Sequence, residues 1–343
     1  MRAVEFSPDK GFQVVDVALG SLAADEVRLQ VEACGVCGSD RQVVQGESVP
    51  PGTSFPLVMG HEIAGTVTEV GEQVKQWQVG DEVIVHPFIS CGTCAPCQHN
   101  QPNLCVRQTC IGYQQAGGFA EMVTVPASQL VRRPKGCDAA AAALLVDAFA
   151  TPYHAMRLAD VAPGSTVLVI GTGGLGLAAL RLAGAFAVGR LGAVTRRDAG
   201  LDSVAAHGAE MVVSMQDEPR NVARQMRRWS GAGGIDVVID TVANKETVKF
   251  ALDVVRPGGA VTLIGMSEDD AVLPIAKSVR RGVRLLTSYG SELEDVRALS
   301  DWVAAGRLDP SVLLAGTLAL EEVEQAFSPV RASGRWVITP RTL

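Results

Sequence analysis

A glycine pattern in the middle of the chain constrains the fold more than any other feature. The apolar run Val167–Ile170 predicts a strand that is buried on both faces. Gly171, Gly173 and Gly176 follow it, and small and apolar residues then recur at helical spacing as far as Ala185. A strand, a glycine turn and a helix in this order are typical of a doubly wound sheet that binds a dinucleotide.

Each glycine has its own physical task in such a turn. Gly171 allows the sharp turn, Gly173 leaves room for a pyrophosphate, and Gly176 lets the helix pack closely on the strand. The pyrophosphate would then meet the free N–H groups at the helix N-terminus. We therefore predict that the cofactor contacts this glycine turn together with Gly174 and Leu175.

Further apolar runs alternate with helical stretches after this turn. They lie at Leu191–Val194, Val212–Val213, Val237–Ile239 and Ala260–Ile264. Such alternation predicts an α/β domain built on a parallel sheet. A length of 343 residues is typical of about two domains.

The remaining sequence predicts a second, β-rich domain. Short alternating strands such as Val27–Glu32 stand between Gly and Pro residues, and a last strand is expected at Trp336–Ile338. We expect the tail to rejoin the first domain. The predicted division is residues 1–148 with 289–343, around a nucleotide-binding domain of residues 149–288.

Composition excludes several classes of protein. A net charge of −7 offers no basic surface for nucleic acid or an anionic membrane. No apolar run approaches the roughly 18 residues of a membrane span. Glu5 and Pro8 interrupt the N-terminus where a signal peptide needs apolar residues. We expect a cytoplasmic protein whose partner is a small molecule.

Four of the eight cysteines, Cys91, Cys94, Cys97 and Cys105, are crowded into one short segment. In a large cytoplasmic chain such crowding indicates metal binding rather than disulfides. Four thiolates complete a tetrahedral zinc shell, which makes a structural site. The alternative is a reduced cluster without metal, which would be prone to oxidation.

A second set of candidate zinc ligands lies nearer the N-terminus. Cys37 stands in a Gly-Val-Cys-Gly-Ser-Asp segment, and His61 stands in Gly-His-Glu. A catalytic zinc takes about three protein ligands and leaves one position for substrate. Either residue alone is weak evidence, because a lone histidine is more often structural than a ligand.

The predicted second strand of the nucleotide-binding domain ends at Thr195, Arg196 and Arg197. A site for NAD requires Asp or Glu here, about 20 residues past the glycines. A hydroxyl and two guanidinium groups instead suit the 2′-phosphate of NADP, because Arg binds phosphate with a planar fork. This favours NADP(H) over NAD(H). The alternative is a solvated charged turn.

Together these residues resemble the zinc-containing medium-chain dehydrogenase/reductase family, the zinc alcohol dehydrogenases. The resemblance extends over essentially the whole chain. Its specific motifs are G-H-E-x2-G-x5-G-x2-V, which begins at Gly60, and the segment Cys91–Cys105. It implies a GroES-like catalytic domain beside a Rossmann domain, hydride transfer between an alcohol and a nicotinamide, two zinc ions per chain, and a homodimer or homotetramer.

The resemblance also implies roles for individual residues. Cys37, His61 and Asp147 hold the catalytic zinc; many members carry Cys or Glu at the position of Asp147. Glu62 resembles a residue that binds the metal transiently or supports its ligands. Asp40 resembles the partner that orients His61, as imidazole ligands commonly require.

Two further roles concern the substrate and the cofactor. Ser39 matches the hydroxyl that hydrogen-bonds the alcohol and starts a proton relay, and Thr151 resembles the residue that packs on the nicotinamide. In many members a histidine three residues after the serine finishes the relay. Gln42 stands at that position and cannot take a proton at neutral pH, so we expect the proton to leave through the cofactor ribose and water.

Three other functions are alternatives to this one. A zinc-free reductase of the same superfamily should lack Cys37, His61 and the four clustered cysteines. A polyol or sugar-derived alcohol dehydrogenase would use the same zinc and cofactor, and the sequence leaves this alternative open. A non-catalytic zinc-binding interaction module is opposed by the acidic charge and by Ser39.

Overall fold

The computed structural model describes residues 1–196, 200–328 and 333–340. The chain divides into two units, Met1–Ala150 with Ser291–Leu343, and Thr151–Gly290. The sequence placed these boundaries two residues earlier, after residues 148 and 288. Within the described part of the chain, no helix is long and apolar enough to cross a membrane.

The second unit contains a six-stranded sheet in which each neighbouring pair is parallel. The strand order is β13-β12-β11-β14-β15-β16. The strands are β11 (Thr166–Ile170), β12 (Arg190–Thr195), β13 (Met211–Ser214), β14 (Ile235–Asp240), β15 (Val255–Leu263) and β16 (Arg284–Thr287). This is the strand order of a doubly wound dinucleotide-binding sheet, so the predicted α/β class is confirmed.

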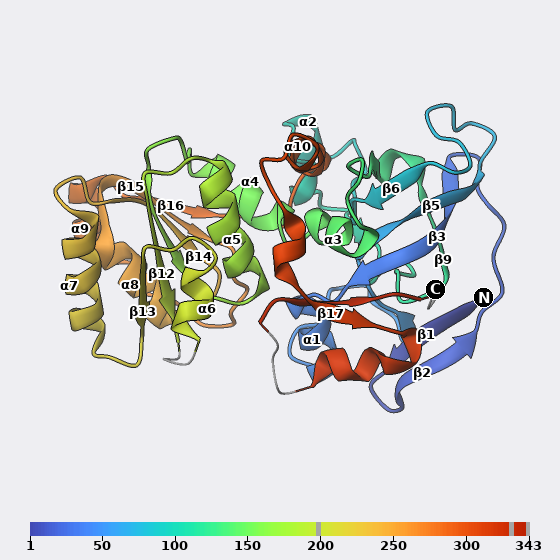
Figure 1. Cartoon of the computed structure of the whole chain (residues 1–343), viewed down its shortest axis with the longest axis horizontal. Helices are drawn as coiled ribbons and strands as arrows, with labels where there is room; N and C mark the ends of the chain where they lie inside the picture. The colour runs from blue at the N-terminus through green and yellow to red at the C-terminus, as the bar shows by residue number, and fades with distance from the viewer. Residues whose placement is uncertain (197–199, 329–332, 341–343) are drawn as a thin grey trace. The chain divides into compact units, whose positions relative to one another are not determined.

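Helices cover both faces of this sheet (Figure 1). They are α5 (Gly174–Ala185) and α6 (Leu201–Ala205) on one face, and α7 (Pro219–Ser230), α8 (Lys245–Val254) and α9 (Ile275–Arg281) on the other. The core joins sheet residues such as Leu168 and Val238 to Val222 of α7 and Phe250 of α8. β16 was not expected, because its residues are mostly exposed and show no apolar pattern.

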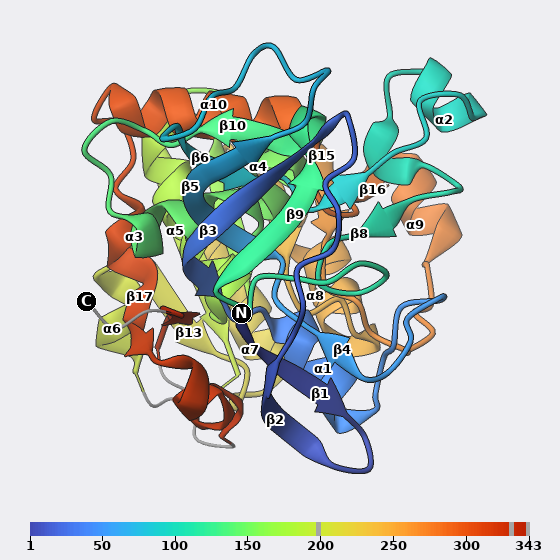
Figure 2. The same ribbon diagram turned by 90° about the vertical axis from the view of Figure 1, so that its right-hand side faces the viewer.

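The first unit is built on strands that pair antiparallel, except for one parallel pair, β17 with β18. Its main sheet has the order β10-β6-β5-β3-β18-β17, and β9 also pairs with β3. Figure 2 shows β9, β3, β5 and β6 beside one another. The strands are β3 (Glu26–Gly35), β5 (Glu62–Val70), β6 (Glu82–Val85), β9 (Met122–Pro126), β10 (Leu130–Arg132), β17 (Leu314–Leu318) and β18 (Arg335–Ile338).

Smaller elements complete the first unit. A separate three-stranded sheet is formed by β1 (Arg2–Ser7), β2 (Gly11–Asp16) and β4 (Leu57–Val58), and β7 (Phe88–Ile89) pairs with β8 (Thr109–Cys110). The helices are α1 (Gly38–Gln45), α2 (Ala95–Gln98), α3 (Ala139–Ala143) and α10 (Leu293–Ala304), while α4 (Ala150–Leu158) begins at the boundary between the units.

The tail rejoins the first unit through β18, which lies antiparallel to β3. Its register places Val337 opposite Gly35 and Ile338 opposite Cys34. Alternate residues of β3 point into a common apolar core, as the period of a half-buried strand requires. The pairing therefore carries residues from the end of the chain to the segment that precedes Cys37.

Candidate active site

Strand pairing brings Cys37 and His61 together. The register of β3 and β5 places Gly35 opposite Glu62. Because Cys37 lies two residues after the end of β3 and His61 lies directly before β5, both residues lie at the same end of the sheet. Cys37 caps the N-terminus of α1, and its backbone N–H donates to Asp40 Oδ2 at 2.8 Å. Asp40 Oδ1 lies 3.4 Å from His61 Nδ1. One buried carboxylate thus orients both candidate ligands.

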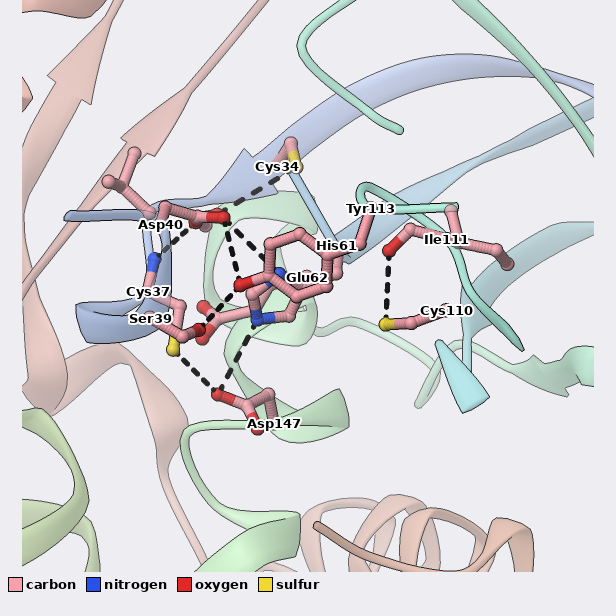
Figure 3. Close-up of polar contacts among 12 residues, drawn as sticks. Cys34, Cys37, Ser39, Asp40, His61, Glu62, Cys110, Ile111, Tyr113 and Asp147 are labelled. Carbon is pink, nitrogen blue, oxygen red and sulfur yellow. Dashed lines mark hydrogen bonds and ion pairs between the residues drawn. The ribbon is translucent and has the colours of Figure 1, made fainter. Parts of the chain in front are cut away.

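Asp147 completes the cluster from a different part of the chain. It follows the short 3-10 helix Leu144–Val146. Its Oδ2 accepts a hydrogen bond from Cys37 Sγ at 3.1 Å and lies 3.9 Å from His61 Nε2 (Figure 3). The ligand atoms of Cys37, His61, Glu62 and Asp147 all lie within 4.8 Å of one another, and all four residues are buried.

Glu62 is paired with an arginine that the sequence analysis did not single out. Arg335 Nη2 lies 3.2 Å from Glu62 Oε1 and 3.4 Å from Asp147 Oδ2. Burial raises the pKa of Glu62 to about 8, although the positive charge of Arg335 opposes that rise. A Cβ at Gly35 would lie 2.0 Å from Glu62 Oε2, so glycine is needed there to make room for the carboxylate.

The electrostatics of this cluster favour a cation. Burial tends to raise the pKa of Asp147, but hydrogen bonding and charge from His61, together with Arg335, hold it well below its usual range. Burial tends to lower the pKa of His61, but the neighbouring carboxylates of Asp40 and Asp147 raise it above its ordinary value. The surroundings therefore keep a carboxylate ionised and stabilise positive charge beside it.

The donor set fits zinc. A thiolate, an imidazole and a carboxylate are all common ligands of this ion, and three protein ligands leave a position for substrate. Within the described residues, the Glu62 carboxylate makes an ion pair with Arg335 and no hydrogen bond, and it lies within 4.8 Å of the other ligand atoms, so this side chain can serve as a further ligand. Asp40 beside His61 Nδ1 is the outer carboxylate that metal-bound histidines commonly require.

Ser39 lies at the edge of the same cluster, in the first turn of α1, and is half-buried. Its Oγ accepts a hydrogen bond of 2.7 Å from the hydroxyl of Tyr113. That hydroxyl also lies 3.4 Å from Asp40 Oδ1, and the Tyr113 ring centroid is 5.3 Å from that of His61. Figure 3 shows the Tyr113 hydroxyl between Ser39 and Asp40.

No sequence motif predicts that Arg335 or Tyr113 belongs to the site. Arg335 is brought to the site by the pairing of β18 with β3, which follows no local pattern. Tyr113 comes from a turn after β8. A tyrosine within a Gly-Tyr-Gln-Gln-Ala-Gly-Gly segment has no spacing rule that assigns it to a metal site.

The four clustered cysteines meet around α2, in a segment that stands out from the main sheet of its unit (Figure 2). Cys94 Sγ lies 3.4 Å from Cys97 Sγ and 3.7 Å from Cys105 Sγ. Sulfur atoms bound about 2.3 Å from one tetrahedral zinc would be about 3.8 Å apart, whereas a disulfide bond is about 2.0 Å. The separations therefore fit shared metal ligation and exclude disulfides between these sulfur pairs.

The electrostatics around these four cysteines also indicate a bound cation. Hydrogen bonding from the backbone of Thr93 lowers the pKa of Cys91 to about 5, whereas burial and neighbouring thiols raise that of Cys97 to about 11. Arg107 Nη2 donates to Cys91 Sγ at 3.2 Å. Four thiolates cannot ionise side by side without a compensating cation, and a divalent zinc would supply most of that charge.

The glycine turn of the second unit has the predicted backbone features. Gly171 has a φ of +89°, in the left-handed region. A Cβ at Gly176 would lie 2.0 Å from the carbonyl oxygen of Gly171, so helix and strand pack closely here. A Cβ at Gly173 would meet no described atom within 4 Å. Gly174–Leu175 open α5, whose N-cap Gly173 has no side chain to accept from the first N–H groups of the helix.

The end of β12 presents a hydroxyl and a guanidinium group. Thr195 is buried, and its Oγ1 accepts a hydrogen bond of 3.0 Å from Thr172 Oγ1 in the glycine turn. Arg196 is exposed, and Arg197 lies outside the described residues. Thr151 is buried in the first turn of α4.

Comparison with known proteins agrees with both units. The alcohol dehydrogenase GroES-like domain matches residues 23–135, and the zinc-binding dehydrogenase domain matches residues 174–305. An alcohol dehydrogenase of Geobacillus stearothermophilus is 30% identical, over 96% of this chain and 96% of its own length. A protein of Arthroderma otae named "Probable D-xylulose reductase A" is 32% identical, over 90% of this chain and 88% of its own length.

Solved structures share the whole fold. A crystal structure described as a zinc-binding dehydrogenase from Sinorhizobium meliloti 1021, with NADP bound, has a TM-score of 0.91 at 29% identity and covers 99% of both chains. The two units and these matches define a zinc-binding oxidoreductase. The chain belongs to the zinc-dependent alcohol dehydrogenases of the medium-chain dehydrogenase/reductase family, as its resemblance predicted.

Proposed function

We propose that this chain catalyses the reversible oxidation of a primary or secondary alcohol, with NADP as hydride acceptor, at a zinc ion held by Cys37, His61 and Asp147. The observation that carries the proposal is the buried cluster of a thiol, an imidazole and carboxylates within 4.8 Å. When bound, zinc supplies a Lewis acid for the substrate oxygen.

The other side chains near this cluster have separate roles in the proposal. Ser39 accepts the alcohol proton, because its hydroxyl is half-buried beside the proposed ligands. Asp40 holds Cys37 and His61 in orientation through its two oxygens. Arg335 balances the charge of the buried Asp147 carboxylate and opposes the rise that burial causes in the pKa of Glu62. Thr151 packs on the nicotinamide.

NADP is preferred in this proposal because of the end of β12. Thr195 and Arg196 offer a hydroxyl and a guanidinium group, and neither would repel a 2′-phosphate as a carboxylate would. The glycine turn receives the pyrophosphate, where the space beside Gly173 and the N-terminus of α5 favour an anion. A second zinc, held by the cysteines around α2, has a structural role.

A polyol or sugar-derived alcohol is the second candidate for the substrate. The observation that favours it is the similarity to the relative named as a D-xylulose reductase. Zinc and cofactor would act on such a substrate in the same way. The difference would lie in the rates with polyols and with simple alcohols.

A homodimer or homotetramer is also part of the proposal. β16 is an edge strand, and apolar residues of α9 and of the loop before it are exposed, among them Val272, Ile275 and Val279. An exposed apolar edge of this kind favours pairing with a second copy of the chain. All eight cysteines are free, which suits the reducing cytoplasm in which we place the protein.

Initial rates test the proposed chemistry. Zinc-replete protein would be assayed with primary, secondary, aromatic and polyol alcohols, each with NADP and with NAD. We expect a higher kcat/KM with NADP, and the best alcohol distinguishes the two substrate classes. Turnover with NAD alone would overturn the cofactor assignment, and no alcohol-dependent cofactor reduction across the panel would overturn the proposed reaction.

A further inference from the structure

We propose that Tyr113 is a positioning residue for the reaction, whose phenol hydroxyl fixes the orientation of Ser39. The inference rests on the proposed function of Ser39 as the group that accepts the alcohol proton. Tyr113 and Ser39 are 74 residues apart in sequence, and their oxygens are 2.7 Å apart in the structure. No motif of the sequence linked the two residues.

The turn that carries Tyr113 is held by its own backbone. The N–H of Tyr113 donates to the carbonyl of Cys110 at 3.1 Å, and the N–H of Gly112 donates to the carbonyl of Gln115 at 2.9 Å. A Cβ at Gly112 would lie 2.9 Å from backbone atoms of Gly60. The turn is therefore packed closely against the residue before His61.

The side chain of Tyr113 is fixed as well. Its ring is buried and lies 5.3 Å from the His61 ring, at a tilt of 41°. Its hydroxyl has Ser39 Oγ on one side and Asp40 Oδ1, at 3.4 Å, on the other (Figure 3). A phenol keeps its proton at neutral pH, so the hydroxyl can donate a hydrogen bond.

The contact with Tyr113 restricts the orientation of the Ser39 hydroxyl. A serine hydroxyl has one proton and two lone pairs, and a half-buried serine otherwise samples several rotamers. The single phenol proton of Tyr113 has two acceptors within reach, Ser39 Oγ at 2.7 Å and Asp40 Oδ1 at 3.4 Å, and the shorter contact assigns it to one lone pair of Ser39. The other lone pair stays available for the proton of the alcohol, while the proton already on Ser39 passes to the cofactor ribose hydroxyl and from there to water. Tyr113 thus raises the fraction of time in which Ser39 is oriented for the reaction.

The competing explanation is that Tyr113 only packs against His61. Tyr113→Phe separates the two roles, because phenylalanine keeps the ring and removes the hydroxyl. Cys110→Ala is a matched control, since it alters the same turn and leaves the phenol in place. Zinc content of both variants should equal that of the wild type, because neither substitution removes a proposed ligand. The thermal midpoint of each should fall by no more than about 4 °C, since each loses one buried polar group.

A double-mutant cycle with Ser39→Ala gives the decisive readout. Single-turnover rates of cofactor reduction, with the best alcohol of the panel, would be measured for the wild type, Tyr113→Phe, Ser39→Ala and the double variant. We expect Tyr113→Phe to slow the reaction about tenfold, with KM nearly unchanged, since one hydrogen bond is lost. In the Ser39→Ala background the same substitution should have almost no effect.

The outcomes separate this inference from the proposed function. Equal slowing in both backgrounds, or no slowing of the wild type, would overturn the positioning role even if Ser39→Ala is strongly impaired. An unimpaired Ser39→Ala would overturn the proposed role of Ser39 and the inference with it. A crystal structure of Tyr113→Phe gives a readout without activity: we expect Ser39 to occupy more than one rotamer, and a single unchanged rotamer would contradict the inference.

Discussion

Asp147 Oδ2 accepts a hydrogen bond from the Cys37 thiol at 3.1 Å, although 110 residues separate the two in sequence. Both side chains are buried, and Arg335 lies beside the same carboxylate oxygen. A carboxylate and a thiol that are buried this close together lose solvation, and a shared metal ion restores favourable electrostatics to both.

Asp147→Asn should remove the catalytic zinc while the fold persists. Asparagine keeps the size of the side chain but loses the charge that a third ligand supplies. We expect kcat/KM for alcohol oxidation to fall at least about a hundredfold, and zinc to fall from two ions per chain to one. Metal analysis and initial rates measure this. The exposed variant Asp16→Asn is the control, and full zinc with full activity in Asp147→Asn would contradict the ligand assignment.

Cys94→Ser should remove the other zinc. A structural metal contributes its binding energy to folding, so we expect the thermal midpoint to fall by at least about 5 °C and one zinc per chain to remain. Cys137→Ser, at a half-buried cysteine outside both clusters, should keep two zinc ions and the wild-type midpoint. Retention of both zinc ions by Cys94→Ser would show that this cysteine is not a ligand.

Arg196→Ala tests the preference for NADP. A guanidinium group that binds the 2′-phosphate contributes a charge-assisted hydrogen bond, so its loss should lower kcat/KM for NADP about tenfold or more. The value for NAD should change little, because NAD lacks that phosphate. The control is Arg224→Ala on α7, which is equally exposed. An equal fall with both cofactors would assign Arg196 a role other than phosphate recognition.

His86 should make the protein less stable in acid. Burial lowers its pKa to about 4 from an ordinary 6.5, and its Nε2 faces the carbonyl of Ser291 at 3.1 Å. Between these values the unfolded chain binds a proton that the folded chain does not, so stability is lost as pH falls below 6.5. We expect a loss of about 2 kcal/mol by pH 5.

His86→Gln is the matched variant for this prediction. The glutamine amide can keep a donor toward Ser291, and it does not titrate. Denaturant unfolding at pH 7.5, 6.5, 5.5 and 5 would be compared for the two proteins, both zinc-replete. The wild type should lose more stability than the variant on acidification. Parallel pH profiles would contradict the buried, neutral state of His86.

The structural features that were predicted from sequence are formed by residues that lie close together in the chain. Gly171 and Gly176 are needed because a left-handed turn and a close helix–strand approach lie within a few residues. The cysteines around α2 are close in sequence, so their meeting requires only one short segment to fold. Asp147, by contrast, was assigned only through the family resemblance.

The parts that were not predicted depend on pairing between distant segments. Arg335 reaches Glu62 because β18 pairs with β3, and Tyr113 reaches Ser39 because its turn packs on Gly60. Neither contact produces a periodic pattern or a characteristic spacing of residues in the sequence. β16 was missed for another reason: as a short, exposed edge strand it has no buried face to produce an apolar pattern.

The most direct test of the account is zinc-dependent reduction of NADP by an alcohol. Wild-type protein would be treated with a chelator until it loses one of two zinc ions, assayed, and assayed again after one equivalent of zinc is restored. The account predicts that activity is lost with that zinc and returns with it, whereas Asp147→Asn gains no activity from added zinc. Undiminished alcohol-dependent NADP reduction by the chelated protein would contradict catalysis at a zinc held by Cys37, His61 and Asp147.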